Sequence, residues 1–138
     1  MKITNQLIIS FIVFSNMAMA NVKHFVAFKF KPEVTSLQKQ QIQKKFMLLK
    51  DECLKDGKKY ILSIESGPVI SKEGFDQKFE QGYIVTFKSL ADKDYYVGKP
   101  FSSSFDPAHE NFKSFVGPLL QTDANNNING VFVFDFNY

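Results

Sequence analysis

The segment "VFVFDF", Val131 to Phe136, decides the fold of this chain. Valine and phenylalanine favour β-strands, and successive side chains of a strand point to opposite faces of its sheet. The two valines therefore point one way and the three phenylalanines point the other way. Because a sheet face of exposed phenylalanine would form a large sticky patch, the pattern indicates a sheet that is covered on both faces.

The first strand, predicted over Val22–Phe30, repeats this two-sided pattern. Its apolar residues are Val26, Phe28 and Phe30 on one face and Phe25 and Ala27 on the other. Two strands with two apolar faces are best explained by a second copy of the sheet, which would close a dimeric barrel. The alternative is a monomer with an open groove, which we favour less.

A helix is predicted after this strand. Thr35 and Gln38 form a capping box, and apolar residues then recur at helical spacing on one face. This face consists of Ile42, Phe46, Leu49 and Cys53. The helix is expected to run to about Lys55, because Asp56 and Gly57 end it.

The order of the remaining elements predicts an α+β fold. They are strands Tyr60–Glu65 and Tyr83–Phe87, a short helix from Ser89 through Tyr96, a helix that opens at Asp106 and Pro107, and the last strand, with loops at Ser71–Lys78, Gly98–Phe105 and Asp123–Gly130. The order β-α-β-β-α-β is that of the ferredoxin-like fold, with a four-stranded antiparallel sheet. Right-handed crossovers place both helices on one face of this sheet.

The N-terminal residues have the layout of a signal peptide. Lys2 precedes a short apolar run, Leu7–Phe14, and Ala18-Met-Ala20 forms a cleavage signal. An uncut membrane anchor is the less favoured alternative, because the run is too short to span a bilayer. We therefore expect residues 1–20 to be removed, residues 21–138 to form one domain, and the protein to be secreted or periplasmic, without a membrane association after cleavage.

Composition narrows the classes of function. The net charge is +3, every basic residue is lysine, and the lysines are scattered among acidic residues. Without arginine there is no bidentate clamp for phosphate, and nucleic-acid binding is not expected. No phosphate loop or dinucleotide fingerprint is present, and two distant histidines are a poor metal signature, so we expect no cofactor and no metal.

Three segments carry a resemblance to a known family. "VKHFVAFKFKPEV", "DPAHENFKSFVGPLL" and "VFVFDF", in this order, resemble the stress-responsive A/B barrel domain over Val22–Phe136. The resemblance implies a homodimer of ferredoxin-like subunits whose sheets face each other. Most members of that family have no established activity, some plant members are stress-associated, and one plant branch comprises polyketide cyclases.

The resemblance to the cyclases also implies candidate site residues. In that branch a histidine of an "HPAH" segment is the base, and a tyrosine before it positions the substrate. His109 and Tyr96 match these two positions, and the first-strand His24 matches a histidine that lines the pocket. Two positions depart from the cyclases, because Asp106 and Gln81 stand where they have histidines. Candidate ligand contacts are His24, Gln81 and Tyr83.

Physical reasoning places His109 independently of the resemblance. If Asp106 is the N-cap, His109 lies in the first helical turn, where the helix dipole disfavours an imidazolium. Its spacing to Phe112 and Val116 turns the ring toward the sheet. His24 could then share a cavity with His109, near Tyr96. The alternative is two half-buried histidines that hydrogen-bond to the backbone.

Two further residues have ordinary interpretations. Cys53, on the apolar helix face, is expected to be a small core residue. Asp135 interrupts the last strand, either as a polar contact at the barrel end or, as we favour, as a solvated strand end.

Two functions remain open. The first is a dimeric binding or stress-associated protein that takes a small apolar or carbonyl-containing ligand and has no chemistry of its own. The second is a cofactor-free enzyme acting on a carbonyl compound, as a lyase, cyclase or monooxygenase, with His109 as the base. The incomplete set of cyclase residues favours the first.

Overall fold

The computed structural model describes residues 20–138, so the expected signal peptide lies outside the described residues except for Ala20. Its elements are β1 (Val22–Phe28), α1 (Ser36–Glu52), β2 (Leu54–Lys55), β3 (Lys58–Lys59), β4 (Ile61–Pro68), β5 (Gln81–Phe87), α2 (Leu90–Val97), α3 (Pro107–Val116), the 3-10 turn η1 (Gly117–Leu119) and β6 (Val131–Asn137). Within the described residues, no helix is both long and apolar enough to cross a membrane.

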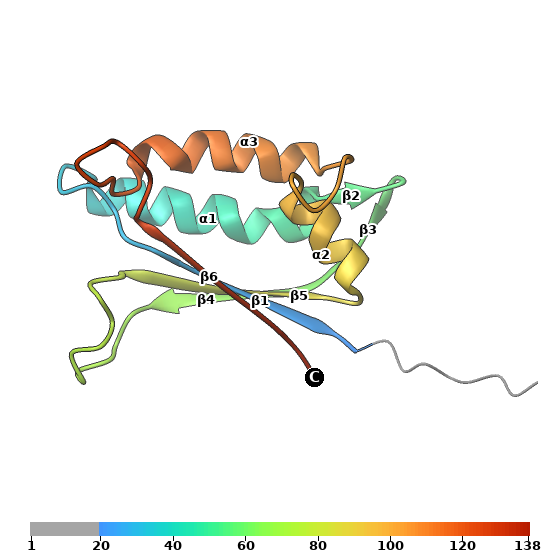
Figure 1. The fold of residues 1–138 in the computed structure, drawn as a ribbon, viewed down its shortest axis with the longest axis horizontal. Coiled ribbons are helices and arrows are strands. Elements are labelled where there is room, and N and C mark those ends of the chain that lie inside the picture. The colour runs from blue at the N-terminus through green and yellow to red at the C-terminus, as the bar shows by residue number, and fades with distance from the viewer. Residues whose placement is uncertain (1–19) are drawn as a thin grey trace, which may run out of the picture.

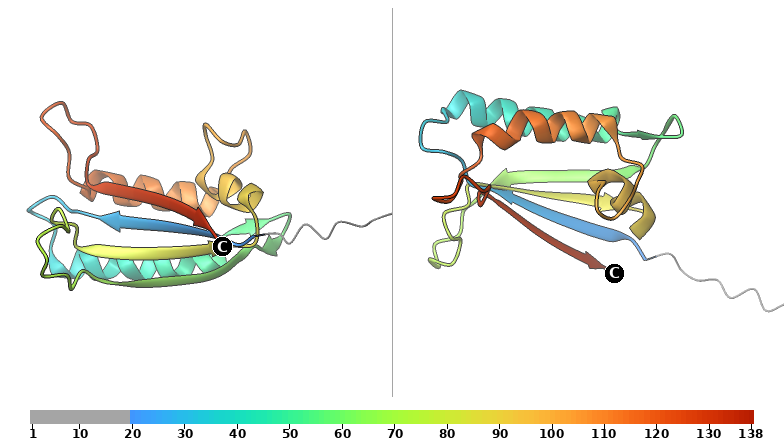
Figure 2. Two further views of the ribbon diagram at one scale, coloured as in Figure 1. Left: turned by 60° about the horizontal axis from the view of Figure 1, so that its bottom comes forward. Right: turned by 45° about the horizontal axis from the view of Figure 1, so that its top comes forward.

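The main sheet has four antiparallel strands in the order β4-β5-β1-β6. Helices α1 and α3 lie side by side on one face of it, and the short α2 lies near one end (Figure 1). This arrangement confirms the predicted ferredoxin-like α+β fold. The other face carries no helix, as the views in Figure 2 also show.

Helix α1 begins as predicted and ends earlier. The capping box between Thr35 and Gln38 is formed on both sides, and the buried face contains three of the four expected residues, Ile42, Phe46 and Leu49. The fourth, Cys53, is the C-cap. The predicted end near Lys55 is wrong, because strands β2 and β3 pair as a small hairpin. Its turn is Asp56-Gly57, with both residues at positive φ.

The strand ends also differ from the predicted ones. The first strand stops at Phe28, and Phe30 makes an isolated bridge to Leu120. Strands β4 and β5 are longer than predicted, because their pairing continues to Pro68 opposite Gln81. Hydrogen bonds between the two backbones extend the sheet over Ser66–Pro68 and Gln81–Gly82, although these segments have no alternating apolar pattern.

Helix α3 starts at a buried acidic cap. The Asp106 carboxylate accepts hydrogen bonds from the backbone N–H groups of Ala108 and His109. Its second oxygen accepts a hydrogen bond from the Tyr60 hydroxyl at 2.8 Å. The predicted N-cap is therefore present, and it also ties the start of α3 to the residue that precedes β4.

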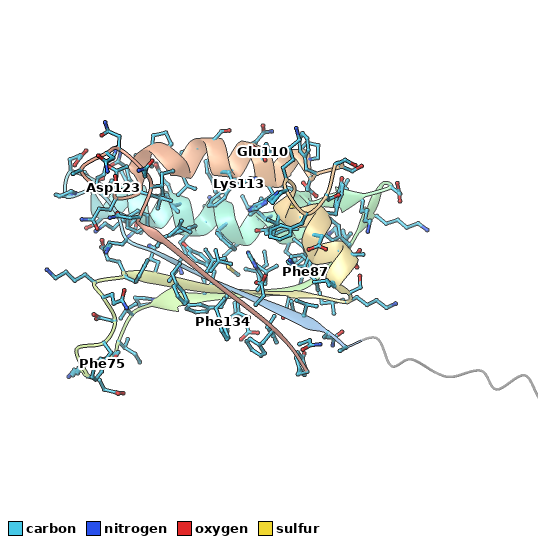
Figure 3. The ribbon with its side chains drawn as sticks, in the orientation of Figure 1. Phe75, Phe87, Glu110, Lys113, Asp123 and Phe134 are labelled. Carbon is cyan, nitrogen blue, oxygen red and sulfur yellow. The ribbon has the colours of Figure 1, made fainter. Side chains whose placement is uncertain are left out.

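The uncovered sheet face is rich in phenylalanine. Phe132, Phe134 and Phe136 are 46%, 56% and 47% exposed. Figure 3 shows Phe134 on the side of the sheet away from the helices. The connection between β4 and β5 projects on the same side, and Phe75 near its tip is 84% exposed (Figure 3).

Candidate functional site

A cavity of about 540 Å³ lies between α3 on one side and strands β1 and β6 on the other. Its apolar wall comprises Val26, Phe28, Phe46, Val97, Phe101, Phe112, Val116, Leu120, Ile128, Val131 and Val133. The polar groups that line it are His24, Lys93, Lys99, His109, Lys113 and Asp135. The volume is typical of small-molecule sites in proteins, which are mostly apolar with a few placed polar groups.

His109 is held in one tautomer. Its Nδ1 lies 2.6 Å from the backbone oxygen of Tyr96. Because a carbonyl oxygen can only accept, Nδ1 carries the proton and Nε2 is left with its lone pair. The imidazole also stacks on the Tyr96 ring, with centroids 3.6 Å apart and planes 15° apart. The ring is thus fixed by both a hydrogen bond and a stacking contact.

Burial keeps His109 neutral. Removal from water lowers the pKa of its imidazole from 6.5 to about 3, and nearby Lys113 acts in the same direction. The hydrogen bond to the Tyr96 carbonyl opposes this shift and is outweighed. At pH 7 the ring is therefore a neutral acceptor.

His24 has a carboxylate partner. It lies directly opposite Asp135 in the antiparallel pairing of β1 with β6. Its Nδ1 is 2.6 Å from Asp135 Oδ1, so Nδ1–H donates and Nε2 is again the free acceptor. Burial lowers the pKa of His24, and the Asp135 carboxylate works against this effect. Asp135 therefore belongs to the candidate site and makes the polar contact that the sequence left open, while its side chain stays partly exposed to solvent.

Three lysines line the same cavity as these histidines. Lys93 is buried, with Nζ 2.6 Å from Asp94 and 3.6 Å from Asp135. Its ammonium also lies 4.6 Å from the centroid of the Phe101 ring. Lys113 on α3 pairs with Glu110 at 2.6 Å, and the exposed Lys99 follows α2.

Of the five predicted site residues, two line the cavity and three do not. His24 and His109 both line it. Tyr96 is buried beneath His109, and its hydroxyl has no hydrogen-bond partner within residues 20–138. Tyr96 therefore positions His109 and does not reach the cavity.

The side chains of Gln81 and Tyr83 make contacts within the protein interior. The Tyr83 hydroxyl donates to Gln81 Oε1 at 2.7 Å, and the Gln81 amide donates to the backbone oxygen of Lys39. The Tyr83 ring stacks on Phe46, with centroids 3.9 Å apart. Neither residue lines the cavity, because α1 covers this part of the sheet.

Cys53 is a core residue. The Cys53 side chain is fully buried, and burial together with the neighbouring Asp106 raises the pKa of its thiol. A reactive thiolate would require the opposite shift. Across residues 20–138, no group of three potential metal-ligating side chains is present.

Sequence reasoning left the role of Asp135 open and missed the lysines of the cavity. The one signal for Asp135 was a charged residue within an apolar strand, on the same face as Val131 and Val133. Its pairing with His24 needs the strand register, which alternation alone does not give. The lysines carried no signal, because they are scattered along the sequence.

The structure is a ferredoxin-like α+β domain with a cavity between helix and sheet. The family model "Stress responsive A/B Barrel Domain" matches residues 22–138. The chain belongs to this family, as the three sequence segments predicted.

Solved structures with the same fold have low sequence identity to this chain. A hydroxynitrile lyase from Passiflora edulis is 18% identical, with a TM-score of 0.65, and the match covers 86% of this chain and 93% of that one. A dimeric ferredoxin-like protein of unknown function from Jannaschia sp. CCS1 is 17% identical, with a TM-score of 0.62 and coverage of 84% and 97%. A comparison with curated proteins gives no match.

The lowered pKa of His109 predicts a loss of stability in acid. The unfolded imidazole has a pKa of 6.5 and the folded one about 3, so between these values the unfolded chain binds more protons. Stability should fall as the pH drops below 6.5, by about 2 kcal/mol at pH ~5 from this group. Urea denaturation at several pH values measures it.

The His109→Gln variant is the control for this effect. Glutamine keeps a hydrogen-bond donor and does not titrate, so the variant should lose less stability between pH ~7.5 and pH ~5 than the wild type does. Equal losses in the two proteins would show that His109 is accessible to protons in the folded state.

Proposed function

We propose that the protein binds a small apolar or carbonyl-containing ligand in the cavity between α3 and strands β1 and β6. The observation that carries this proposal is an apolar space of about 540 Å³ with two imidazoles in its wall. In each imidazole Nδ1 is occupied by the protein, which leaves Nε2 for a ligand. Most of the wall can contact hydrocarbon, and the two acceptors can fix the orientation of a polar group.

A pair of neighbouring tryptophan variants tests the binding. Val131 lines the cavity, whereas Phe132 points to the opposite face of β6. Val131→Trp should fill the space and reduce the binding of an apolar ketone such as 2-nonanone below detection by isothermal titration calorimetry. Phe132→Trp keeps an aromatic side chain on the opposite face and changes no residue of the cavity wall, so it should leave the affinity within about twofold of the wild type. Equal affinities in both variants would place the binding outside the cavity.

A second candidate is a cofactor-free enzyme that moves a proton on a carbonyl compound. The resemblance to the cyclases implies His109 as the base. However, efficient general bases have a pKa near the working pH, and that of His109 is about 3. His24 is the stronger base of the two, because Asp135 stabilises its imidazolium. One structural neighbour is named a hydroxynitrile lyase, so this fold can carry lyase chemistry.

Hydrogen exchange tests this second candidate without a known substrate. A base removes a proton from the carbon beside a carbonyl group, the enolate forms, and a solvent deuteron returns to that carbon. Wild-type protein in heavy water should exchange these protons of 2-nonanone faster than buffer does. His24→Gln should reduce the enzymatic rate by ~10²–10⁴-fold if proton transfer is limiting. An unchanged rate in His24→Gln, with a loss in His109→Gln, would restore His109 as the base.

We also propose that two copies associate through the uncovered sheet face. The three phenylalanines of β6 on this face are about half exposed, and such patches mark interaction sites. The related structure from Jannaschia sp. CCS1 is described as dimeric. A second copy would cover the phenylalanines and leave the cavity, on the other face, to the ligand.

Glutamate substitutions at two adjacent residues of β6 distinguish a loss of association from a general loss of stability. Phe134→Glu should give a monomer or an aggregate, because a carboxylate cannot be buried without a partner. Val133→Glu changes a residue on the cavity side, so it should leave the molar mass from light scattering unchanged. A folded wild-type monomer at micromolar concentration would contradict the proposal.

A further inference from the structure

We propose that the ligand is a single-chain amphiphile with an anionic head, of the class of aliphatic monocarboxylates, and that its tail lies toward the start of β6. This inference rests on the proposed binding function and adds the chemical class and the orientation of the ligand. Two features of the cavity carry it: the distribution of polar groups along its length and the excess of cations in its wall.

The cavity changes from polar to apolar along the strands. At one end His24 pairs with Asp135, and four residues along β1 Phe28 pairs with Val131. Four residues of strand span roughly 13 Å. Helix α3 runs with the same polarity, from His109 to Val116. Polar groups from three elements therefore gather at one end of a space that is longer than a single functional group.

The other end offers hydrocarbon alone. It is formed by Val116, Leu120, Ile128 and Val131, together with Phe28 on β1. A ligand with polar groups at both ends would lose hydrogen bonds to water there without replacement. An alkyl chain gains by burial at roughly 0.8 kcal/mol per CH₂ group, so the length of the chain should set the affinity.

The cavity wall has more cations than anions. Lys93, Lys99 and Lys113 line it, whereas Asp135 is the one carboxylate in the wall. Lys99 follows the end of α2, where the backbone oxygens of Tyr96 and Val97 accept hydrogen bonds from His109 and Lys113. The two histidines are neutral at pH 7, because burial lowers the pKa of both. Two of the ammonium groups have carboxylate partners, so an anionic head would compensate the third, that of Lys99, and a cationic head would be repelled by it.

The ion pairs of the three lysines show which ammonium group is left to interact with a ligand. Lys93 is buried against Asp94 and Asp135, and Lys113 pairs with Glu110. Lys99 has no carboxylate within ion-pair distance among residues 20–138. Phe101, in the same loop after α2, also lines the cavity. The head of the ligand is therefore placed beside Lys99, in the wall to which Lys93 and Lys113 also contribute.

Three probes that share one alkyl tail and differ in the head group test which charge the cavity prefers in the head of the ligand. Decanoate, decanol and decylammonium, each below its micelle concentration, are titrated into the full chain by calorimetry. Decanoate should bind tightest and decylammonium weakest, and salt should weaken decanoate most, because screening acts on the charged pair. Decanol binding as tightly as decanoate would overturn the inference.

Charge-reversed variants locate the head. Lys99→Glu should weaken decanoate by roughly two- to fivefold, the upper range of exposed ion pairs, and leave the affinity for decanol unchanged. Lys44→Glu, on the exposed side of α1, makes the same change of net charge and should have little effect. If the two variants weaken decanoate equally, the anion is not held beside Lys99.

The outcomes separate this inference from the proposed function. If Val131→Trp abolishes the binding of all three probes and the heads do not matter, the cavity binds ligands and the anionic class is wrong. If no probe binds, or if Val131→Trp and Phe132→Trp behave alike, the binding function itself fails.

Discussion

The buried carboxylate of Asp106 is the contact on which the site depends. It caps α3 through the N–H groups of Ala108 and His109, and it accepts the Tyr60 hydroxyl from the segment before β4. A cap of this kind contributes typically ~1 kcal/mol to a helix, and leaving the tyrosine unpaired would add a further cost. More importantly, it fixes the first turn of α3, from which His109 reaches the cavity.

The two histidines of the cavity differ in proton affinity because their hydrogen-bond partners differ. A neutral carbonyl holds His109, and burial therefore decides its proton affinity. A carboxylate holds His24, which compensates part of the cost of burying an imidazolium. The same tautomer thus gives a hydrogen-bond acceptor at one position and a stronger base at the other. The two proposed functions, ligand binding and proton transfer, would each use this difference.

The last strand serves two faces of the molecule. Val131 and Val133 contribute to the cavity, while Phe132, Phe134 and Phe136 lie on the face without helices. Because α3 does not close against β6, the valines remain partly exposed, and a space for a ligand is left. The edge strand β6 therefore contributes one apolar face to the cavity and the other to the surface that is proposed for association.

The sequence by itself determined the class of fold, the start of α1 at Thr35, the cap at Asp106 and the two faces of β6. These features follow from local patterns, namely alternation, helical spacing and capping, which act over a few residues. Strand ends and the end of α1 were less well predicted, because backbone pairing with distant segments decides them.

Only the tertiary structure decided which polar groups meet. The pairing of His24 with Asp135 depends on the register between two strands that are 111 residues apart in sequence at this contact. Tyr83 and Gln81 were excluded from the cavity because α1 packs over them, and Lys93, Lys99 and Lys113 entered it from two helices and a loop. Local propensity does not predict such contacts, because their energy depends on packing between distant elements. The chemistry of the site depends on these contacts.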